Sequence, residues 1–134
     1  MKSFALASGS SGNSIYVENS EKECILLDCG IPVSKIEQLL LEKERSLENI
    51  KAIFISHEHY DHVSGLESLI SKIPNLPIYL SKGTLSKLNL KCENINLIKN
   101  HSVINLINLR ILCISKPHDA LEPLSFLIEN KKKH

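Results

Sequence analysis

Residues 56–66 read SHEHYDHVSGL, and this stretch decides both the fold class and the chemistry. Within residues 57–62, three histidines and one aspartate follow the spacing H-x-H-x-D-H. Imidazole and carboxylate groups together suit borderline cations such as zinc, iron or manganese. A solvated loop is the alternative, but four ligand side chains in six residues favour a metal site. The four candidate ligands are His57, His59, Asp61 and His62.

The sequence on either side predicts that rigid elements hold this stretch. Residues 52–55 form an apolar run typical of a buried strand, and Ser64-x-x-Glu67 has the form of a capping box at a helix start. Alternate residues of an extended loop share a side, so His57 and His59 are expected to point the same way. Asp61 and His62 then turn toward the helix. Glu58 and Tyr60 are expected outside or behind the ligands.

The remaining pattern predicts an α/β (α+β) fold, with strands first, then strands alternating with helices, then strands again. A mixed β-sheet covered by helices on one face satisfies this order. A second capping box, Ser34-x-x-Glu37, begins a helix, and another short helix is expected at 84–88. The expected strands are 4–7, 14–18, 24–28, 52–55, 78–80, 95–98, 103–107, 109–115 and 124–129.

The composition indicates one soluble globular domain. The chain has 134 residues, 43% of them hydrophobic, and a net charge of +1. Near-neutral charge excludes a nucleic-acid binder that works through bulk basicity, because counterion release needs clustered Lys and Arg. No apolar run approaches the roughly 18 residues of a membrane span. The apolar start is too short for a signal peptide, so we expect a cytoplasmic protein.

Other candidate residues have simpler interpretations. The four cysteines form no CxxC pair and are expected to be reduced and buried. The Ser/Gly loop at 8–14 is either a turn or a substrate-facing loop, in which case Ser10 and Asn13 bind substrate. His101 and His134 match no motif and are expected at the surface. Residues 131–133 are three lysines, which predict a solvated tail.

The stretch 56–66 resembles the signature of the metallo-β-lactamase superfamily. Residues 26–30, LLDCG, resemble the Asp-x-Gly strand end that precedes the signature in that superfamily. ASGSSGNS at 7–14 and PHDALEP at 117–123 narrow the resemblance to the YycJ/VicX (WalJ) branch of metal-dependent exonucleases. The resemblance implies a four-layer αββα sandwich of two similar halves, of which this chain holds the first. Residues 1–134 would be a single domain, incomplete at its C-terminus.

The resemblance also implies roles for individual residues. His57, His59 and His118 would hold a first metal ion, and Asp61 and His62 would contribute to a second. Asp61 would also be catalytic, orienting the attacking water. Asp28 would support the ligands through hydrogen bonds. The superfamily completes its site with a later bridging aspartate and a final histidine, and neither follows in a matching motif here.

The implied function is hydrolysis by a metal-bound hydroxide, with DNA phosphodiesters as the leading substrate and one or two zinc ions as cofactor. Manganese or iron could replace zinc. One alternative is a small-molecule thioester or lactone hydrolase. Another is a weakly active or non-catalytic fragment that binds one zinc. The expected partners are a nucleic acid and no membrane, with a second copy or a missing C-terminal half covering an exposed sheet face. For the 134-residue chain we expect about one tightly held metal and weak or absent nuclease activity.

Overall fold

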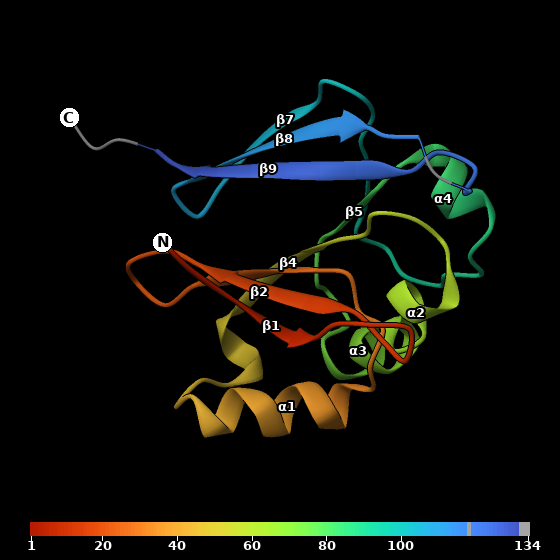
Figure 1. Cartoon of the computed structure of the whole chain (residues 1–134). Helices are drawn as coiled ribbons and strands as arrows, with labels where there is room; N and C mark the ends of the chain where they lie inside the picture. Colours follow the sequence, from red (N-terminus) through yellow and green to blue (C-terminus); the bar gives the residue numbers. More distant parts are fainter. Residues whose placement is uncertain (118, 132–134) are drawn as a thin grey trace.

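A computed structural model describes residues 1–117 and 119–131 of the chain. Two β-sheets face each other, and two helices cover the outer face of the larger sheet (Figure 1). The expected mixed sheet with helices on one face is therefore confirmed for the first two-thirds of the chain. The last strands do not join that sheet but form a second one, as the sandwich architecture requires.

The larger sheet has six strands in the order β1-β2-β3-β4-β5-β6. The first two pairings are antiparallel and the remaining three are parallel. Parallel strands need crossover connections, so polar loops leave the same edge of the sheet at the ends of β3 and β4. The strands are β1 (Lys2–Ala7), β2 (Ser14–Glu18), β3 (Cys24–Leu27), β4 (Ile50–Phe54), β5 (Ile78–Leu80) and β6 (Ile95–Leu97).

Two crossover helices pack against one face of this sheet. Helix α1 (Val33–Glu42) follows β3 and buries Ile36 and Leu40, which are one turn apart. Helix α3 (Leu66–Lys72) follows β4 and buries Leu66 and Leu69. The short elements are η1 (Leu47–Asn49), α2 (Tyr60–Val63) and α4 (Lys82–Ser86). None of the helices in the described ranges is long and apolar enough to span a membrane.

The smaller sheet is an antiparallel meander of β7 (Val103–Leu106), β8 (Leu109–Ser115) and β9 (Leu124–Asn130). Its inner face meets the larger sheet, where Phe54 stacks on Tyr79 at 4.6 Å and meets Phe126 edge-on at 5.5 Å between ring centroids. The contact with Phe126, together with buried side chains from both sheets, forms one core between them. On its outer face Leu127 is 58% exposed.

Both predicted capping boxes are wrong. Helix α1 begins after Pro32, which caps it without a side-chain hydrogen bond, so Ser34 lies inside the first turn. Helix α3 begins after Gly65, and the hydroxyl of Ser64 instead donates to the carbonyl of Gly30. At the start of α1 the Val33 N–H donates to the Ser68 hydroxyl at 3.0 Å, so a tertiary contact lies at both helix starts. A capping box does occur at Ser46, where the sequence pattern indicated none.

Candidate metal centre

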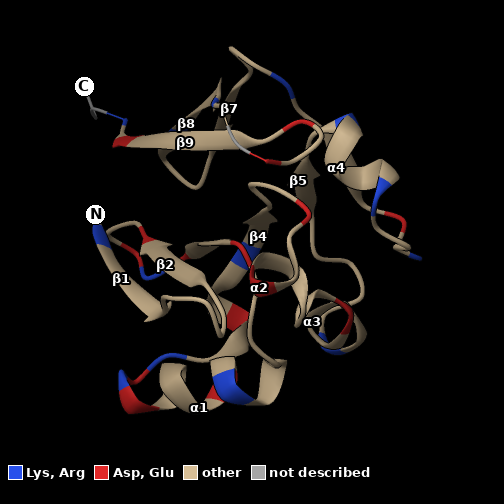
Figure 2. Ribbon diagram, turned by 45° about the vertical axis from the view of Figure 1, so that its right-hand side comes forward, with Lys and Arg blue, Asp and Glu red and all other residues tan. Residues whose placement is uncertain are grey.

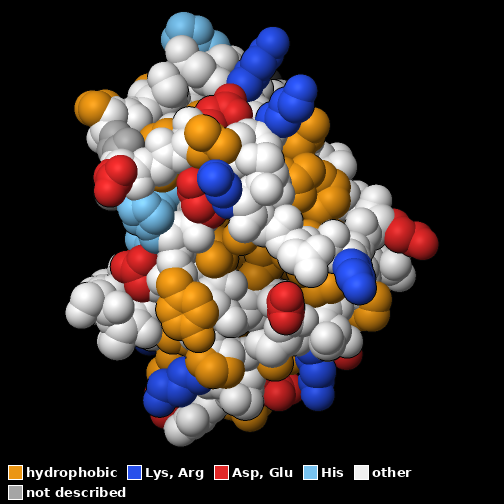
Figure 3. All heavy atoms as spheres, turned by 90° about the vertical axis from the view of Figure 1, so that its right-hand side faces the viewer, with side chains coloured by type: hydrophobic (Ala, Val, Ile, Leu, Met, Phe, Trp, Pro, Cys, Tyr) orange, Lys and Arg blue, Asp and Glu red, His pale blue; other side chains and the backbone are white. Residues whose placement is uncertain are grey.

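The histidine loop follows β4 and enters α2 within a few residues. His57 is only 2% exposed, and His59 caps α2. Asp61 and His62 lie in the turn of α2, which agrees with the predicted change of direction. Tyr60 points to solvent, as expected. In space-filling view, histidine atoms reach the surface between acidic side chains (Figure 3).

The fold brings the three imidazoles of this loop together. The ring centroids of His57 and His59 lie 4.7 Å apart, with the rings nearly perpendicular. Those of His57 and His62 lie 4.1 Å apart. The nearest carboxylate oxygen of Asp61 is 3.7 Å from His62 Nε2. Side chains predicted to be ligands therefore converge on one side of the loop.

Asp28 lies behind the histidines, at the end of β3. It adopts a left-handed conformation, with φ of 66°, which turns the chain beneath the loop. Its Oδ1 accepts from the Ser56 backbone N–H, and its Oδ2 accepts from the Ser56 hydroxyl, each at 2.7 Å. His62 Nδ1 also contacts Oδ2 at 2.8 Å. This hydrogen bond raises the pKa of the His62 imidazole above its ordinary value, against the opposing effect of burial.

Backbone hydrogen bonds join the histidine loop to the Ser/Gly loop and to the turn after β3. The Asn13 N–H donates to the Asp61 carbonyl at 2.7 Å, and the Gly30 N–H donates to the Asn13 carbonyl at 2.8 Å. The Cys29 N–H donates to the His62 carbonyl at 2.8 Å. A Cβ at Gly30 would collide with the Asp61 carbonyl, so glycine is required for this close approach.

The two predicted substrate-binding residues lie in different settings. Ser10 is exposed on the Ser/Gly loop. The amide of Asn13 donates to the Gly9 carbonyl at 2.8 Å and to Asp61 Oδ2 at 3.1 Å. Asn13 therefore holds the loop and orients Asp61. Contact of either residue with substrate stays a prediction.

Glu58 has a role that the sequence analysis did not anticipate. It is half-buried, and its Oε2 accepts from the Leu121 N–H at 3.1 Å. Glu122 in turn accepts from the Gly83 N–H at 2.7 Å at the start of α4. The segment 119–123 is thus tied to both the histidine loop and α4. In its sequence, DALEP, the acidic residue Glu122 was the available signal. His118 lies outside the described residues.

The donor groups present fit a borderline cation by chemistry. Imidazoles and a carboxylate converge, and two of the imidazoles have polar partners at Nδ1. Within residues 1–117 and 119–131, no group of three His, Cys, Asp or Glu side chains is spaced to enclose an ion. The third imidazole implied for the first ion, His118, is not in those ranges.

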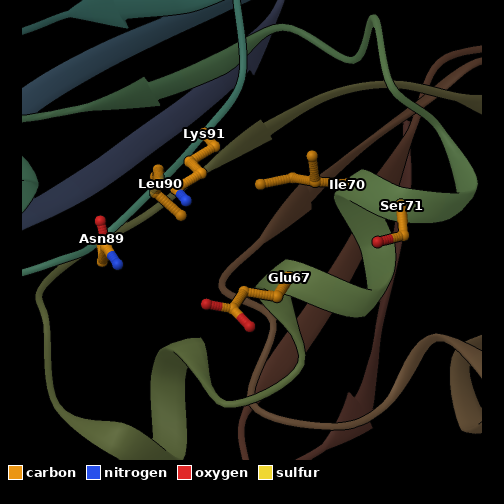
Figure 4. Close-up of a pocket in the computed structure, with 6 residues that line it drawn as sticks. All are labelled: Glu67, Ile70, Ser71, Asn89, Leu90 and Lys91. Carbon is orange, nitrogen blue, oxygen red and sulfur yellow. The ribbon is translucent and has the colours of Figure 1, made fainter.

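A hollow elsewhere on the surface is unrelated to this chemistry. It measures about 340 Å³ and lies between α3 and residues 89–91. Figure 4 shows Glu67, Ile70 and Ser71 on the helix side, facing Leu90 and Lys91. None of the histidines that the structure describes lines it.

The other residues singled out from sequence have structural settings. Cys24, Cys29 and Cys113 are buried and unpaired, as expected, whereas Cys92 is only half-buried. Burial raises the pKa of the Cys29 thiol to about 12. His101 is exposed, as predicted. His134 and two of the three terminal lysines lie outside the described residues.

The two-sheet sandwich carries its histidine-rich loop directly after β4, at the edge where β3 and β4 end. Residues 7–89 match the sequence profile of the metallo-beta-lactamase superfamily. The chain belongs to this superfamily.

Curated relatives with several activities are similar to the chain. It is 29% identical to exodeoxyribonuclease YycJ of Bacillus anthracis over 133 residues, which cover 96% of the chain and 50% of that protein. It is 46% identical to exodeoxyribonuclease WalJ of Streptococcus pneumoniae over 79 residues, covering 59% and 29%. It is 35% identical to hydroxyacylglutathione hydrolase of Buchnera aphidicola over 99 residues, covering 74% and 36%. The chain therefore spans half or less of these relatives.

Solved structures share the fold. The Rm3 metallo-beta-lactamase superposes with a TM-score of 0.78 at 20% identity, covering 96% of the chain and 54% of that structure. The di-zinc metallo-beta-lactamase LRA-12 from an Alaskan soil metagenome gives 0.74 at 15% identity, covering 92% and 54%. The predicted metallo-β-lactamase-like fold is confirmed, over about half of such a chain.

Proposed function

We propose that this chain carries the metal-binding half of a DNA phosphodiester hydrolase. The observation that carries the proposal is the convergence of His57, His59 and His62, with Asp61 beside them, at the edge where β3 and β4 end. The similarity to YycJ over 96% of the chain supports DNA as substrate.

The ligand roles are those that the superfamily resemblance implies. His57 and His59 would hold the first ion together with His118, and Asp61 and His62 would contribute to a second. A bound ion supplies positive charge for the transition state and lowers the pKa of a bound water. Asn13 orients the Asp61 carboxylate, and Asp28 orients His62. Zinc is the preferred ion, in keeping with the donor set.

DNA is held at this centre and not by a charged surface. Among the residues that the structure describes, Lys and Arg are spread over the ribbon and form no continuous band in Figure 2. The net charge of +1 also supports DNA binding at the metal centre rather than over a basic surface. We place the protein in the cytoplasm, where its unpaired buried thiols remain reduced.

A thioester hydrolase is the second candidate. The similarity to hydroxyacylglutathione hydrolase over 74% of the chain favours it. A single-zinc fragment without catalysis is the third, and it predicts metal binding with no turnover of either substrate.

One experiment separates these candidates. The 134-residue chain is loaded with zinc, and its metal content, its release of nucleotides from DNA and its hydrolysis of a hydroxyacyl thioester of glutathione are measured. We expect one tightly held ion per chain and weak DNA hydrolysis that exceeds thioester hydrolysis. The variant His59→Asn should lose the ion and the activity. The matched control His101→Asn should lose neither, because His101 is exposed and asparagine tolerates its φ of 72°. No bound zinc in the parent chain, or equal losses in both variants, would refute the proposed metal centre.

A further inference from the structure

Ser56 lies at the centre of a buried hydrogen-bond chain between the two strand ends. Its backbone N–H and its hydroxyl both reach the Asp28 carboxylate, at 2.7 Å each. The same hydroxyl lies 2.8 Å from His57 Nδ1. All three side chains are buried. Asp28 thus contacts His62 directly, at 2.8 Å, and is connected to His57 only through the Ser56 hydroxyl.

The positions of the hydrogens follow from what each group can donate. A carboxylate only accepts, so the single hydroxyl hydrogen of Ser56 points to Asp28. Toward His57 the hydroxyl can then only accept, and the hydrogen between them belongs to His57 Nδ1. By the same reasoning His62 donates from its own Nδ1 to Asp28. In the neutral form of each ring, the lone pair then stays on Nε2.

We propose that Ser56 is a positioning residue that fixes His57 in the Nδ1–H tautomer and transmits the negative charge of Asp28 to it. One buried carboxylate then controls two imidazoles, one directly and one through the hydroxyl. The proposal deepens the proposed metal centre, since a metal ion would bind through the Nε2 atoms of imidazoles whose Nδ1 atoms are oriented in this way. The hydrogen-bond chain itself belongs to the protein without metal.

Substitution of Ser56 can separate two interactions: the backbone hydrogen bond to Asp28, and the hydroxyl contact that links Asp28 to His57, here called the hydroxyl relay. The Ser56 backbone N–H holds Asp28 Oδ1 whatever side chain is present. Ser56→Thr keeps a hydroxyl, whereas the valine of Ser56→Val has nearly the same shape as threonine but no hydroxyl. The added methyl group is common to both variants, so its packing cost cancels in the comparison. Ser56→Ala provides a smaller hydroxyl-free variant if valine prevents folding.

The test is the tautomeric state of the histidines in the full metal-free chain. Long-range ¹H–¹⁵N correlation spectra of protein labelled at histidine nitrogens are recorded at about pH 8, above the ordinary imidazole pKa. We expect Nδ1–H on His57 in the parent chain and in Ser56→Thr, with loss of that tautomer in Ser56→Val and Ser56→Ala. His62 should keep Nδ1–H in all of them. A His57 that carries Nε2–H in the parent chain, or Nδ1–H unchanged in both hydroxyl-free variants, overturns the proposal.

A second measurement uses zinc alone, competed against a chromophoric chelator. Ser56→Val should bind zinc about 10- to 100-fold more weakly than Ser56→Thr, the range typical of groups behind metal ligands. Equal affinities contradict the relay. A parent chain that shows the expected tautomers but binds no zinc would refute the proposed function and leave the hydrogen-bond chain in place.

Discussion

A buried ion pair far from the histidine loop offers a quantitative test of the structure. Arg45 donates from Nε and Nη2 to the two carboxylate oxygens of Glu18, at 2.9 Å each, and the Tyr16 hydroxyl donates to Glu18 Oε2 at 2.8 Å. The side chains of Glu18 and Arg45 are 2% and 12% exposed. Arg45→Met leaves a buried carboxylate with one of its three side-chain donors. Removing one partner of a buried pair costs about 3–5 kcal/mol. A domain of ordinary stability has about 5–15 kcal/mol in total.

Urea unfolding at neutral pH measures this cost. Arg110→Met is the matched control, because Arg110 pairs with Glu129 at 3.2 Å while their side chains are 54% and 57% exposed. That exposed pair should contribute less than about 1 kcal/mol. The reasoning fails if Arg45→Met and Arg110→Met lower the free energy of unfolding equally.

The same pair predicts a dependence on pH. The hydrogen bonds from Arg45 are the main cause that lowers the pKa of Glu18 below its ordinary 4.5. A lowered carboxyl pKa stabilises the fold above the ordinary value, and this contribution is lost as pH falls through the folded-state pKa. The difference in unfolding free energy between the parent chain and Arg45→Met should therefore shrink in acid. A difference that grows below pH 4.5 would contradict this sign.

Three further outcomes are expected. Gly30→Ala forces the Asp61 carbonyl away and should weaken zinc binding at least about tenfold in a chelator competition; unchanged affinity would mean that the loops are not tied as described. Phe54→Ala removes the stacking on Tyr79 within the larger sheet and the edge-on contact with Phe126 across the two sheets, and should cost about 3–5 kcal/mol in urea unfolding, so a loss under about 1 kcal/mol would contradict this core. Iodoacetamide should label half-buried Cys92 well before Cys29, whose pKa burial raises to about 12, and equal rates by peptide mass spectrometry would refute this order.

The strands and the histidine loop could be predicted because their signals are local. Apolar runs such as 52–55 identify buried strands, and the ligand spacing in 57–62 identifies its chemistry without any tertiary information. The assignment of β7–β9 to a separate sheet could not be predicted this way, because strand pairing depends on partners distant in sequence.

The helix starts, and the residues that orient the candidate ligands, could not be predicted from sequence because they depend on tertiary neighbours. Ser64 has the right spacing for a helix cap. Its hydroxyl instead donates to the carbonyl of Gly30, 34 residues away, and does not cap the helix. Ser56 and Glu58 were visible inside the motif, but their roles come from Asp28 and Leu121, which only the fold brings near. Pattern alone identifies candidate ligands more readily than the groups that orient them.

The tying of the histidine loop to Asn13, Cys29 and Gly30 has a thermodynamic consequence. The backbone bonds from Asn13 to Asp61 and from Cys29 to His62 join segments more than 30 residues apart, so the unfolded chain does not hold the donors in this arrangement. A cation that prefers the native arrangement acts as a ligand for folding and raises the free energy of unfolding by mass action. At a free concentration of 100 times its Kd, that gain is about 2.7 kcal/mol. Metal supply would then set how much of the protein is folded as well as how much is loaded.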